Sequence, residues 1–262
     1  MNNGSLNWDS LTEEEKWEKL AFITSVVDFT TLNPTDNKNT LLQMKSKIET
    51  LNSLGLPHPY AICVYPYLVP AAKQLFDLPI ASVVSFPDGM DLPQQKALAT
   101  KVLVDIGVDE IDFVAYLGNI QEGNITDFLQ DITSVVSASS GKPVKLIFET
   151  SLWNNDSFLS SAAYASLEHG IAFLKTNTGK HGHGATIHHA ELFAHVVRNY
   201  YENTGIKKGV KVSGGIRTVQ QAWELILAVT NIIPWATDPA YIRIGASKLI
   251  DSIIEEAKNL QS

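Results

Sequence analysis

Short apolar runs rich in β-branched residues recur eight times along the chain, and longer segments separate them. The runs cover residues 26–32, 60–64, 80–86, 110–115, 144–149, 171–176, 210–213 and 241–245. Several of the intervening segments repeat apolar residues at helical spacing, and they cover residues 38–54, 93–106, 125–137, 157–169, 188–203 and 218–229. A strand followed by a helix, repeated eight times, predicts a parallel sheet buried by helices.

Two closures fit such a sheet, an open doubly wound sheet and a closed (β/α)8 barrel. The length of 262 residues and the number of units favour the barrel. Polar residues inside apolar strands, such as Asp112 and Lys145, also suit a barrel interior better than an open sheet. The chain is therefore predicted to be an α/β protein that folds as a single TIM barrel.

An extra helix is predicted before the first strand, because Thr12 and Glu15 form a capping box ahead of an amphipathic run. No linker or composition break divides the chain, so we expect one domain over residues 1–262. Within it, residues 1–25 form an N-terminal helical cover, 26–250 the barrel and 251–262 the end of a C-terminal helix.

The chain carries 20 basic and 28 acidic residues, and its formal net charge of −8 opposes broad attraction to nucleic acid or to anionic membranes. Its one cysteine, Cys63, has no partner for an internal disulfide, and the N-terminus lacks the features of a signal peptide. No stretch reaches the roughly 20 apolar residues of a membrane span. We expect a cytoplasmic protein with no nucleic-acid or membrane partner, either a monomer or a homodimer.

Two predicted strands place a lysine inside an apolar run, Lys175 in the sixth and Lys211 in the seventh. A buried ammonium is costly, so its pKa falls and the neutral amine can attack a carbonyl to form a Schiff base. A second cation nearby lowers that pKa further, so the two lysines are a candidate catalytic pair. Asp112, in the fourth strand, is a candidate for the proton transfers. The alternatives are lysines that extend to the barrel rim or pair with a carboxylate, and a structural salt bridge at Asp112.

Glycines follow the last three predicted strands, at the end of a TIM barrel where the active site and often a phosphate lie. They are Gly179 beside Lys180, the pair Gly214-Gly215, and Gly245 before Ser247. Backbone N–H groups in such turns approach an anion closely, and the helices that follow present their N-termini. One glycine turn is more often only a tight connection, whereas three on consecutive units predict a phosphate site.

Histidines cluster after the sixth predicted strand, at His181, His183, His188 and His189. Paired imidazoles bind zinc, but the segment has neither an H-E-x-x-H pattern nor cysteine partners, and glycines interrupt it. We expect a flexible, solvated loop and no metal site. The glycine order over residues 179–184 is not the dinucleotide fingerprint, which disfavours a Rossmann dehydrogenase.

Four segments together resemble the motifs of the deoxyribose-phosphate aldolase family. They are Leu174-Lys175-Thr176-Asn177-Thr178-Gly179-Lys180, Lys211-Val212-Ser213-Gly214-Gly215-Ile216-Arg217, Asp28-Phe29-Thr30-Thr31-Leu32 and Asp109-Glu110-Ile111-Asp112. The resemblance runs in order from about Val26 to Ile250. The set is highly specific, although each segment alone is not.

The resemblance implies a metal-independent class I aldolase that reversibly cleaves 2-deoxy-D-ribose 5-phosphate to D-glyceraldehyde 3-phosphate and acetaldehyde, in the breakdown of deoxyribose phosphates. It implies that Lys175 forms the Schiff base, that Lys211 lowers the pKa of Lys175, and that Lys211 and Asp112 relay protons. The expected partners are a sugar phosphate and small aldehydes, with no cofactor beyond the covalent intermediate. The same resemblance implies a substrate and phosphate site formed by Asp28, Thr30, Cys63, Thr178, Gly179, Lys180, Gly214, Gly215, Gly245 and Ser247.

Two features depart from the family pattern. Lys180 is followed by an unusual His-Gly-His-Gly run, and Ser247 is followed by Lys248, where a second small residue is common. For Cys63, a small buried hydrophobic side chain is an equally good interpretation. Two rival functions stay open: another Schiff-base barrel aldolase with a longer, polyhydroxylated donor, and a barrel that binds a sugar phosphate without turnover.

Overall fold

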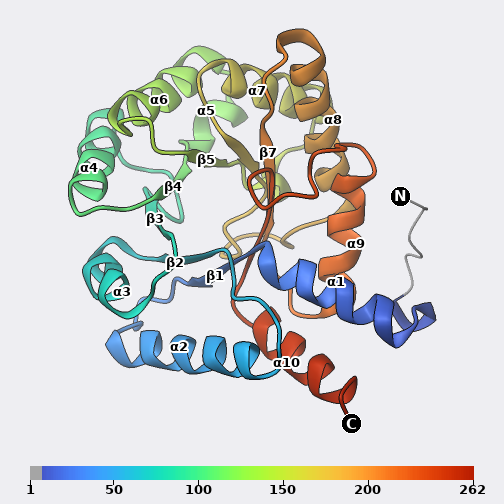
Figure 1. The fold of residues 1–262 in the computed structure, drawn as a ribbon. Helices are drawn as coiled ribbons and strands as arrows, with labels where there is room; N and C mark the ends of the chain where they lie inside the picture. The colour runs from blue at the N-terminus through green and yellow to red at the C-terminus, as the bar shows by residue number, and fades with distance from the viewer. Residues whose placement is uncertain (1–7) are drawn as a thin grey trace.

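The computed structural model describes residues 8–262, with the side chains of residues 120 and 121 excluded, and it forms a closed barrel of parallel strands ringed by helices (Figure 1). Neighbouring strands follow the chain order, and the first pairs with the last. The predicted (β/α)8 fold is confirmed, and each predicted run holds a strand. The strands are β1 (Val27–Thr31), β2 (Ala61–Val64), β3 (Ile80–Val84), β4 (Glu110–Val114), β5 (Val144–Ile147), β6 (Phe173–Lys175), β7 (Gly209–Ser213) and β8 (Ile242–Ala246).

The helices lie outside the strands and cover their outer faces (Figure 1). They are α1 (Glu13–Ser25), α2 (Lys38–Ser53), α3 (Val69–Leu75), α4 (Pro93–Asp105), α5 (Leu117–Gln121), α6 (Ile125–Ala138), α7 (Asp156–Glu168), α8 (Ile187–Thr204), α9 (Val219–Thr230) and α10 (Leu249–Asn259). Short 3-10 turns are η1 (Trp8–Ser10), η2 (Pro66–Leu68) and η3 (Thr150–Leu152). The sequence pattern did not predict α3 and α5, because neither is long enough to show a helical repeat of apolar residues.

The predicted capping box begins α1. The Thr12 hydroxyl accepts a hydrogen bond from the Glu15 backbone N–H at 3.2 Å, and the Glu15 carboxylate accepts one from the Thr12 N–H at 2.9 Å. The helix packs against α9 and α10, which Figure 1 shows beside it. The helical part of the predicted N-terminal cover is thus present, and residues 1–7 lie outside the described residues.

Strand register decides which side chains enter the barrel. Lys175 on β6 pairs with Lys211 on β7, which in turn pairs with Arg243 on β8. Asp112 on β4 likewise pairs with Lys145 on β5. Side chains alternate between the two faces of a strand, so the residues between these charged ones face the helices and join the apolar core. The barrel interior is therefore unusually rich in charge.

A buried ion pair joins α4 to α6 outside the barrel. Lys96 Nζ lies 2.5 Å from Asp131 Oδ2, and the two side chains are 0% and 2% exposed. Asp131 Oδ2 also accepts the Tyr116 backbone N–H at 2.9 Å, whereas Oδ1 has no hydrogen-bond partner. Burial lowers the pKa of Lys96 and raises the pKa of Asp131, and their mutual attraction offsets this only in part. Each partner thus depends on the other to remain charged.

Lys96→Met is expected to destabilise the fold by about 3–5 kcal/mol, because it leaves the Asp131 carboxylate buried without its cation. Urea unfolding followed by circular dichroism measures the effect. Lys47→Met is the matched control, since Lys47 also lies 2.5 Å from an aspartate, Asp251, but that pair is 38% and 56% exposed. The control is expected to cost less than about 1 kcal/mol. Equal losses in both variants would contradict a special role for the buried pair.

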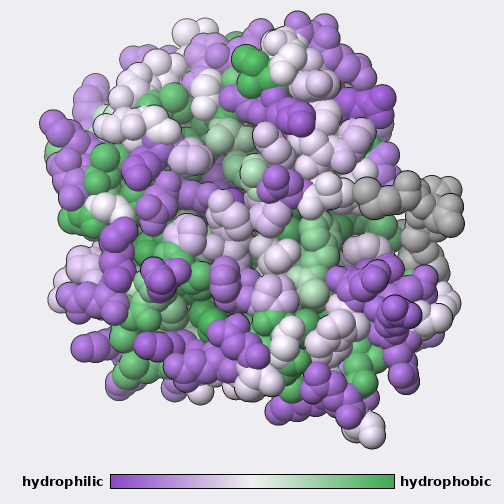
Figure 2. Space-filling view, in the orientation of Figure 1, coloured by the Kyte–Doolittle hydropathy of each residue, from purple (hydrophilic) through white to green (hydrophobic). Residues whose placement is uncertain are grey.

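The face of the molecule in Figure 2 is mainly hydrophilic, in contrast to the apolar core. Hydrophilic residues cover most of the face seen in Figure 2, and hydrophobic residues lie between them in separate groups. Among the described residues, no helix has both the length and the apolar character needed to cross a membrane.

Candidate active site

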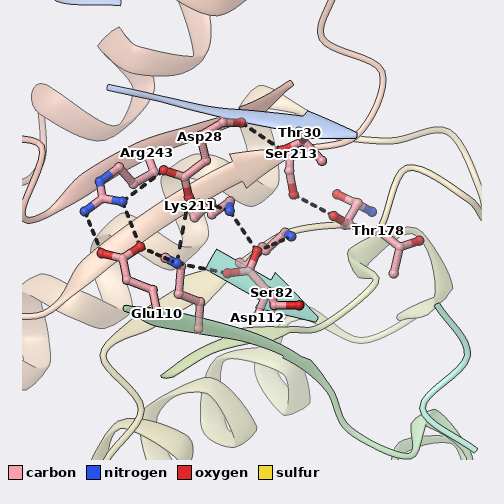
Figure 3. A network of polar contacts seen from close by, with 12 residues as sticks. Asp28, Thr30, Ser82, Glu110, Asp112, Thr178, Lys211, Ser213 and Arg243 are labelled. Carbon is pink, nitrogen blue, oxygen red and sulfur yellow. Dashed lines mark hydrogen bonds and ion pairs between the residues drawn. The ribbon is translucent and has the colours of Figure 1, made fainter. Parts of the chain in front are cut away.

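The charged side chains inside the barrel form one continuous network (Figure 3), and its residues come from six strands, β1 and β4 to β8. It joins three carboxylates to four basic groups through ion pairs. The carboxylates are Asp28, Glu110 and Asp112, and the basic groups are Lys145, Lys175, Lys211 and Arg243. All seven are buried, so their charges interact strongly.

The predicted catalytic residues meet at one point of this network. Asp112 Oδ2 lies 2.6 Å from Lys175 Nζ and 2.7 Å from Lys211 Nζ. One carboxylate oxygen thus bridges the two lysines, which are neighbours in register. The alternative of lysines at the barrel rim is wrong for both, because Lys175 is 3% exposed and Lys211 is 0% exposed. The alternative of pairing with a carboxylate is present for both, since each lysine contacts Asp112.

The remaining members of the network, among them Lys145 and Arg243, hold the carboxylates that the two lysines contact. Lys145 Nζ contacts Glu110 Oε2 at 2.6 Å and the other oxygen of Asp112 at 2.9 Å. Arg243 contacts Glu110 at 3.0 Å and Asp28 at 2.9 Å, and its guanidinium group stacks 3.3 Å from the centre of the Tyr60 ring. This fully paired layer holds the carboxylates in place.

The charge balance of the network leaves one basic group in excess, since four basic groups face three carboxylates. Lys145 contacts all three carboxylates, and Lys211 contacts two, Asp28 at 2.5 Å and Asp112. Lys175 contacts Asp112 alone among the residues described. It is thus the lysine whose proton the network holds least strongly.

The pKa shifts follow the same order. Burial and the nearby charge of Lys211 lower the pKa of Lys175, and Asp112 only partly opposes them. Burial also disfavours charge on Lys211, but Asp112 and Asp28 outweigh it and raise the pKa of Lys211. Asp112 has a pKa well below its ordinary range, because three lysines outweigh its burial. Lys175 is therefore easier to deprotonate than Lys211, and it lies beside an Asp112 whose pKa is lowered.

A cavity of about 300 Å³ opens at the carboxyl ends of β1, β6, β7 and β8. It contains the basic side chains of Lys180, Arg217 and Lys248, and no carboxylate lines it among the described residues. The predicted residues that line it are Thr30, Thr178, Gly179, Lys180, Gly214, Gly215, Gly245 and Ser247. Positive charge without negative charge, next to helix N-termini, suits an anion.

Two of the glycines are required by close approach. A Cβ on Gly214 would lie 2.9 Å from the Cβ of Asn177, and the backbone there has a φ of +103°. A Cβ on Gly245 would lie 2.8 Å from the Cβ of Ser213 and 3.1 Å from Cε of Lys211. Gly245 thus leaves room for the Lys211 side chain, and Gly214 lets two turns of the cavity wall pack together.

Two predicted binding residues, Asp28 and Cys63, lie deeper than the cavity, and one residue that lines the cavity, Asn33, was not predicted. Asp28 belongs to the ion network below the cavity, and Cys63 is fully buried beside Ala81 and Val83 in a small apolar cluster. Neither lines the cavity. Asn33 does, although it was not predicted, and it accepts a contact of 3.4 Å from Lys180 Nζ.

The histidines occupy different environments. His181 pairs with Asp88 at 2.8 Å, and both side chains are exposed. His189 is buried on α8, with Nδ1 3.0 Å from the Thr186 hydroxyl, so the expectation of a solvated loop is wrong for this residue. In the described part of the chain, one group has the spacing of metal ligands, namely Asp156, His188 and His189. It lies in the first turns of α7 and α8, where the positive end of each helix dipole opposes a cation.

Three members of the ion network were not among the predicted site residues. Glu110, Lys145 and Arg243 each sit inside a short apolar strand, as Asp112 does. The same signal that selected Lys175 and Lys211, a charged residue within a buried strand, would have found them. Strand alternation also places Glu110 and Asp112 on the same face, because they are two residues apart.

The sequence matches a known enzyme family. A family model described as "DeoC/LacD family aldolase" matches residues 22–231. This range contains the lysines of β6 and β7 and the carboxylates of β1 and β4.

Solved structures share the fold at low identity. A protein provisionally named deoxyribose-phosphate aldolase from Toxoplasma gondii ME49 superposes with a TM-score of 0.80 at 19% identity, over 94% of this chain and 98% of that one. A second, provisionally named in the same way, from Coccidioides immitis gives 0.74 at 24%, over 92% and 98%. The deoxyribose phosphate aldolase from Aeropyrum pernix, described as tetrameric, gives 0.72 at 24%, over 95% and 96%. At these identities the likeness establishes the fold.

Proposed function

Because the chain belongs to the DeoC/LacD family of aldolases, we propose that it is a class I aldolase that reversibly cleaves 2-deoxy-D-ribose 5-phosphate to D-glyceraldehyde 3-phosphate and acetaldehyde. Lys175 forms the Schiff base, and the reaction requires no metal ion or other cofactor. The reaction serves the cytoplasmic breakdown of deoxyribose phosphates.

One observation carries the proposal: the buried network has one basic group more than it has carboxylates, and Lys175 is the group with a single carboxylate partner. Deprotonating Lys175 makes the network neutral. A neutral, buried primary amine beside a cationic lysine is what attack on a carbonyl requires.

The first chemical step uses the Lys175 nitrogen. Nζ attacks the aldehyde carbon C1 of the open-chain sugar, and loss of water gives a protonated imine. The positive charge on this imine makes C2 a better leaving carbanion, so the bond between C2 and C3 can break once the proton on the C3 hydroxyl is removed. C3 becomes the aldehyde of glyceraldehyde 3-phosphate, and the C2 fragment stays on Lys175 as an enamine.

Protonation of the enamine at C2 and hydrolysis of the imine then release acetaldehyde and restore Lys175. The contacts of Asp112 and Lys211 support a role in these proton transfers, because one oxygen of Asp112 lies within 2.7 Å of both lysine nitrogens. We assign the proton relay to this pair. Lys211 remains the cation that keeps the pKa of Lys175 low.

The phosphate of the sugar fits the cavity above the network. Lys180, Arg217 and Lys248 supply positive charge there, and the glycine turns bring backbone N–H groups close. This basic cavity favours a phosphorylated acceptor over a neutral one.

A turnover assay tests the proposal and separates it from both rivals. The protein is incubated with 2-deoxy-D-ribose 5-phosphate, and acetaldehyde is detected with an alcohol dehydrogenase and NADH. In the reverse direction, acetaldehyde and dihydroxyacetone are compared as donors. We expect cleavage, and condensation with acetaldehyde only. Use of dihydroxyacetone would support an aldolase with a polyhydroxylated donor, and binding without turnover would support a sugar-phosphate sensor.

Lys180→Ala and Lys248→Ala are each expected to raise KM for the phosphorylated sugar about tenfold or more, because each removes a charge-assisted contact to phosphate. Values for unphosphorylated 2-deoxyribose should stay the same. Lys258→Ala is the matched control for Lys248, since Lys248 is the N-cap residue of α10 and Lys258 lies in the last turn of that helix. An unchanged KM in Lys248→Ala would place that side chain outside the phosphate site.

A further inference from the structure

Glu149 combines two features that are unfavourable for folding. It follows β5, its residue is 0% exposed, and its backbone has a φ of +50°, in the left-handed region that residues other than glycine rarely adopt. In the described part of the chain, no ion pair joins its carboxylate to a basic side chain. Strained backbone and a buried acidic side chain without an ion-pair partner persist only where surrounding structure fixes them, and they gather at functional sites.

Hydrogen bonds from the turn after β6, and one from Ser151, account for this carboxylate. Oε1 accepts from Asn177 Nδ2 at 2.9 Å and from the Ser151 hydroxyl at 3.3 Å. Oε2 accepts from the Thr178 backbone N–H at 3.0 Å and also from the Thr178 hydroxyl. Both Asn177 and Thr178 belong to the turn that follows β6, directly after Lys175.

These contacts extend into the cavity wall. The Thr178 hydroxyl oxygen accepts the backbone N–H of Lys180 at 3.0 Å, so Glu149 fixes the turn on both sides of Gly179. Thr178, Gly179 and Lys180 all line the cavity. Asn177 is the residue against which Gly214 packs. The Glu149 carboxylate thus contacts the turn after β6, against which the turn after β7 packs, although Glu149 itself does not line the cavity.

We propose that Glu149 is a positioning residue that holds the turn from Asn177 to Lys180 in the shape that binds the anionic group of the substrate. This inference rests on the proposed function, because it assigns that cavity to the sugar phosphate. Binding depends on the placement of a few donors, so a small shift of this turn weakens phosphate recognition without changing Lys175.

A purely structural role is less consistent with the pattern of contacts. The ends of β5 and β6 are already joined without Glu149, by the Thr150 backbone N–H to the Thr176 carbonyl at 3.1 Å and by the Thr150 hydroxyl to Asn177 Oδ1 at 3.1 Å. Glu149 adds one bond from Asn177 and two from Thr178, and Thr178 is the first residue of this turn that lines the cavity.

Glu149→Gln tests the proposal, because it keeps the side-chain volume but places an amide N–H2 where two donors need acceptors. We expect KM for 2-deoxy-D-ribose 5-phosphate to rise about tenfold or more, the change that a loss of hydrogen bonding to a charged group produces. Kinetic values for unphosphorylated 2-deoxyribose should change less than about twofold. Amide hydrogen exchange at Thr178 and Lys180 should accelerate about tenfold in the ligand-free protein.

Two further variants make the result specific. Ser151→Ala removes one contact to Glu149 and leaves Thr178 bound, so it should behave as the wild-type protein. Thr178→Val removes the hydroxyl contact at nearly constant volume and should reproduce the Glu149→Gln result, which keeps the test decisive if Glu149→Gln does not fold. In the double variant Glu149→Gln/Thr178→Val, the increases in KM should not add in free energy, because both substitutions disrupt the same contact.

The proposal would be overturned if Glu149→Gln raised KM equally for phosphorylated and unphosphorylated sugars. Unchanged amide hydrogen exchange at Thr178 and Lys180 would also overturn it. The exchange measurement needs no substrate, and saturating inorganic phosphate can replace the sugar to show protection of Lys180. A wild-type protein that fails to cleave the sugar would therefore refute the proposed function, while the exchange data would still decide the role of Glu149.

Discussion

Lys175→Ala is expected to lower turnover of 2-deoxy-D-ribose 5-phosphate about 10⁴-fold or more, because removal of the covalent nucleophile abolishes the pathway through the imine. The fold should survive, since alanine leaves Asp112 paired with Lys145 and Lys211. Steady-state kinetics measures the loss, and circular dichroism checks the fold.

Lys208 offers a matched control for this variant. Burial lowers its pKa as it does for Lys175, but Lys208 precedes β7 at the opposite end of the barrel and donates to the Ile171 carbonyl at 2.7 Å. Lys208→Ala should retain full turnover. An active Lys175→Ala protein would refute the mechanism, because no other amine in the network has a single carboxylate partner among the described residues.

Lys211→Met is expected to slow turnover about 10²–10³-fold and to move the pH dependence of imine formation to higher pH. In the wild-type protein, burial and the charge of Lys211 lower the pKa of Lys175, so the neutral amine is present at lower pH. Without Lys211, three basic groups face three carboxylates, and the network is neutral with Lys175 protonated. The pKa of Lys175 then rises, and each unit of rise reduces the neutral amine about tenfold at pH values below it.

The measurement is the rate of imine trapping by acetaldehyde and borohydride between neutral and alkaline pH. We expect the midpoint of the curve for Lys211→Met to lie at least about one pH unit above that of the wild-type protein. Lys208→Met removes a positive charge from the same segment outside the network and should leave the midpoint in place. A shift to lower pH, or none, would show that Lys211 does not control the charge of Lys175.

The sequence was sufficient to predict the fold, because each level of the pattern agrees. Apolar runs of strand length alternate with amphipathic helices, and α1 begins at the capping box of Thr12 as predicted. The short helices α3 and α5 were not predicted, because one or two turns carry too few residues for a repeat. Their positions depend on packing against the barrel.

The sequence predicted which charged residues enter the barrel but not how they pair there. Strand alternation places Lys175, Lys211 and Asp112 inside the barrel, and the structure brings both lysines within hydrogen-bond distance of Asp112. The number of carboxylates that each lysine contacts depends on register and side-chain direction, which the sequence does not specify. The prediction therefore brought the two lysines and Asp112 together but did not anticipate the excess of one basic group over the carboxylates.

Glu149 shows the limit of sequence reasoning most clearly. Its left-handed backbone and its bonds to Thr178 arise only when β5 and β6 lie side by side. No local pattern distinguishes it from an ordinary acidic residue at the end of a strand. His189 is a similar case, since its burial on α8 separates it from the exposed histidines nearby.

Borohydride trapping with acetaldehyde, followed by peptide mapping, tests the central claim that Lys175 is the amine that forms the imine. Reduction of the imine converts the modified lysine to N-ethyl-lysine, which mass spectrometry locates in the sequence. The account predicts one modified residue, Lys175, in the wild-type protein and in Lys208→Ala, and none in Lys175→Ala. Modification of Lys211 instead, or an even distribution over exposed lysines, would contradict it.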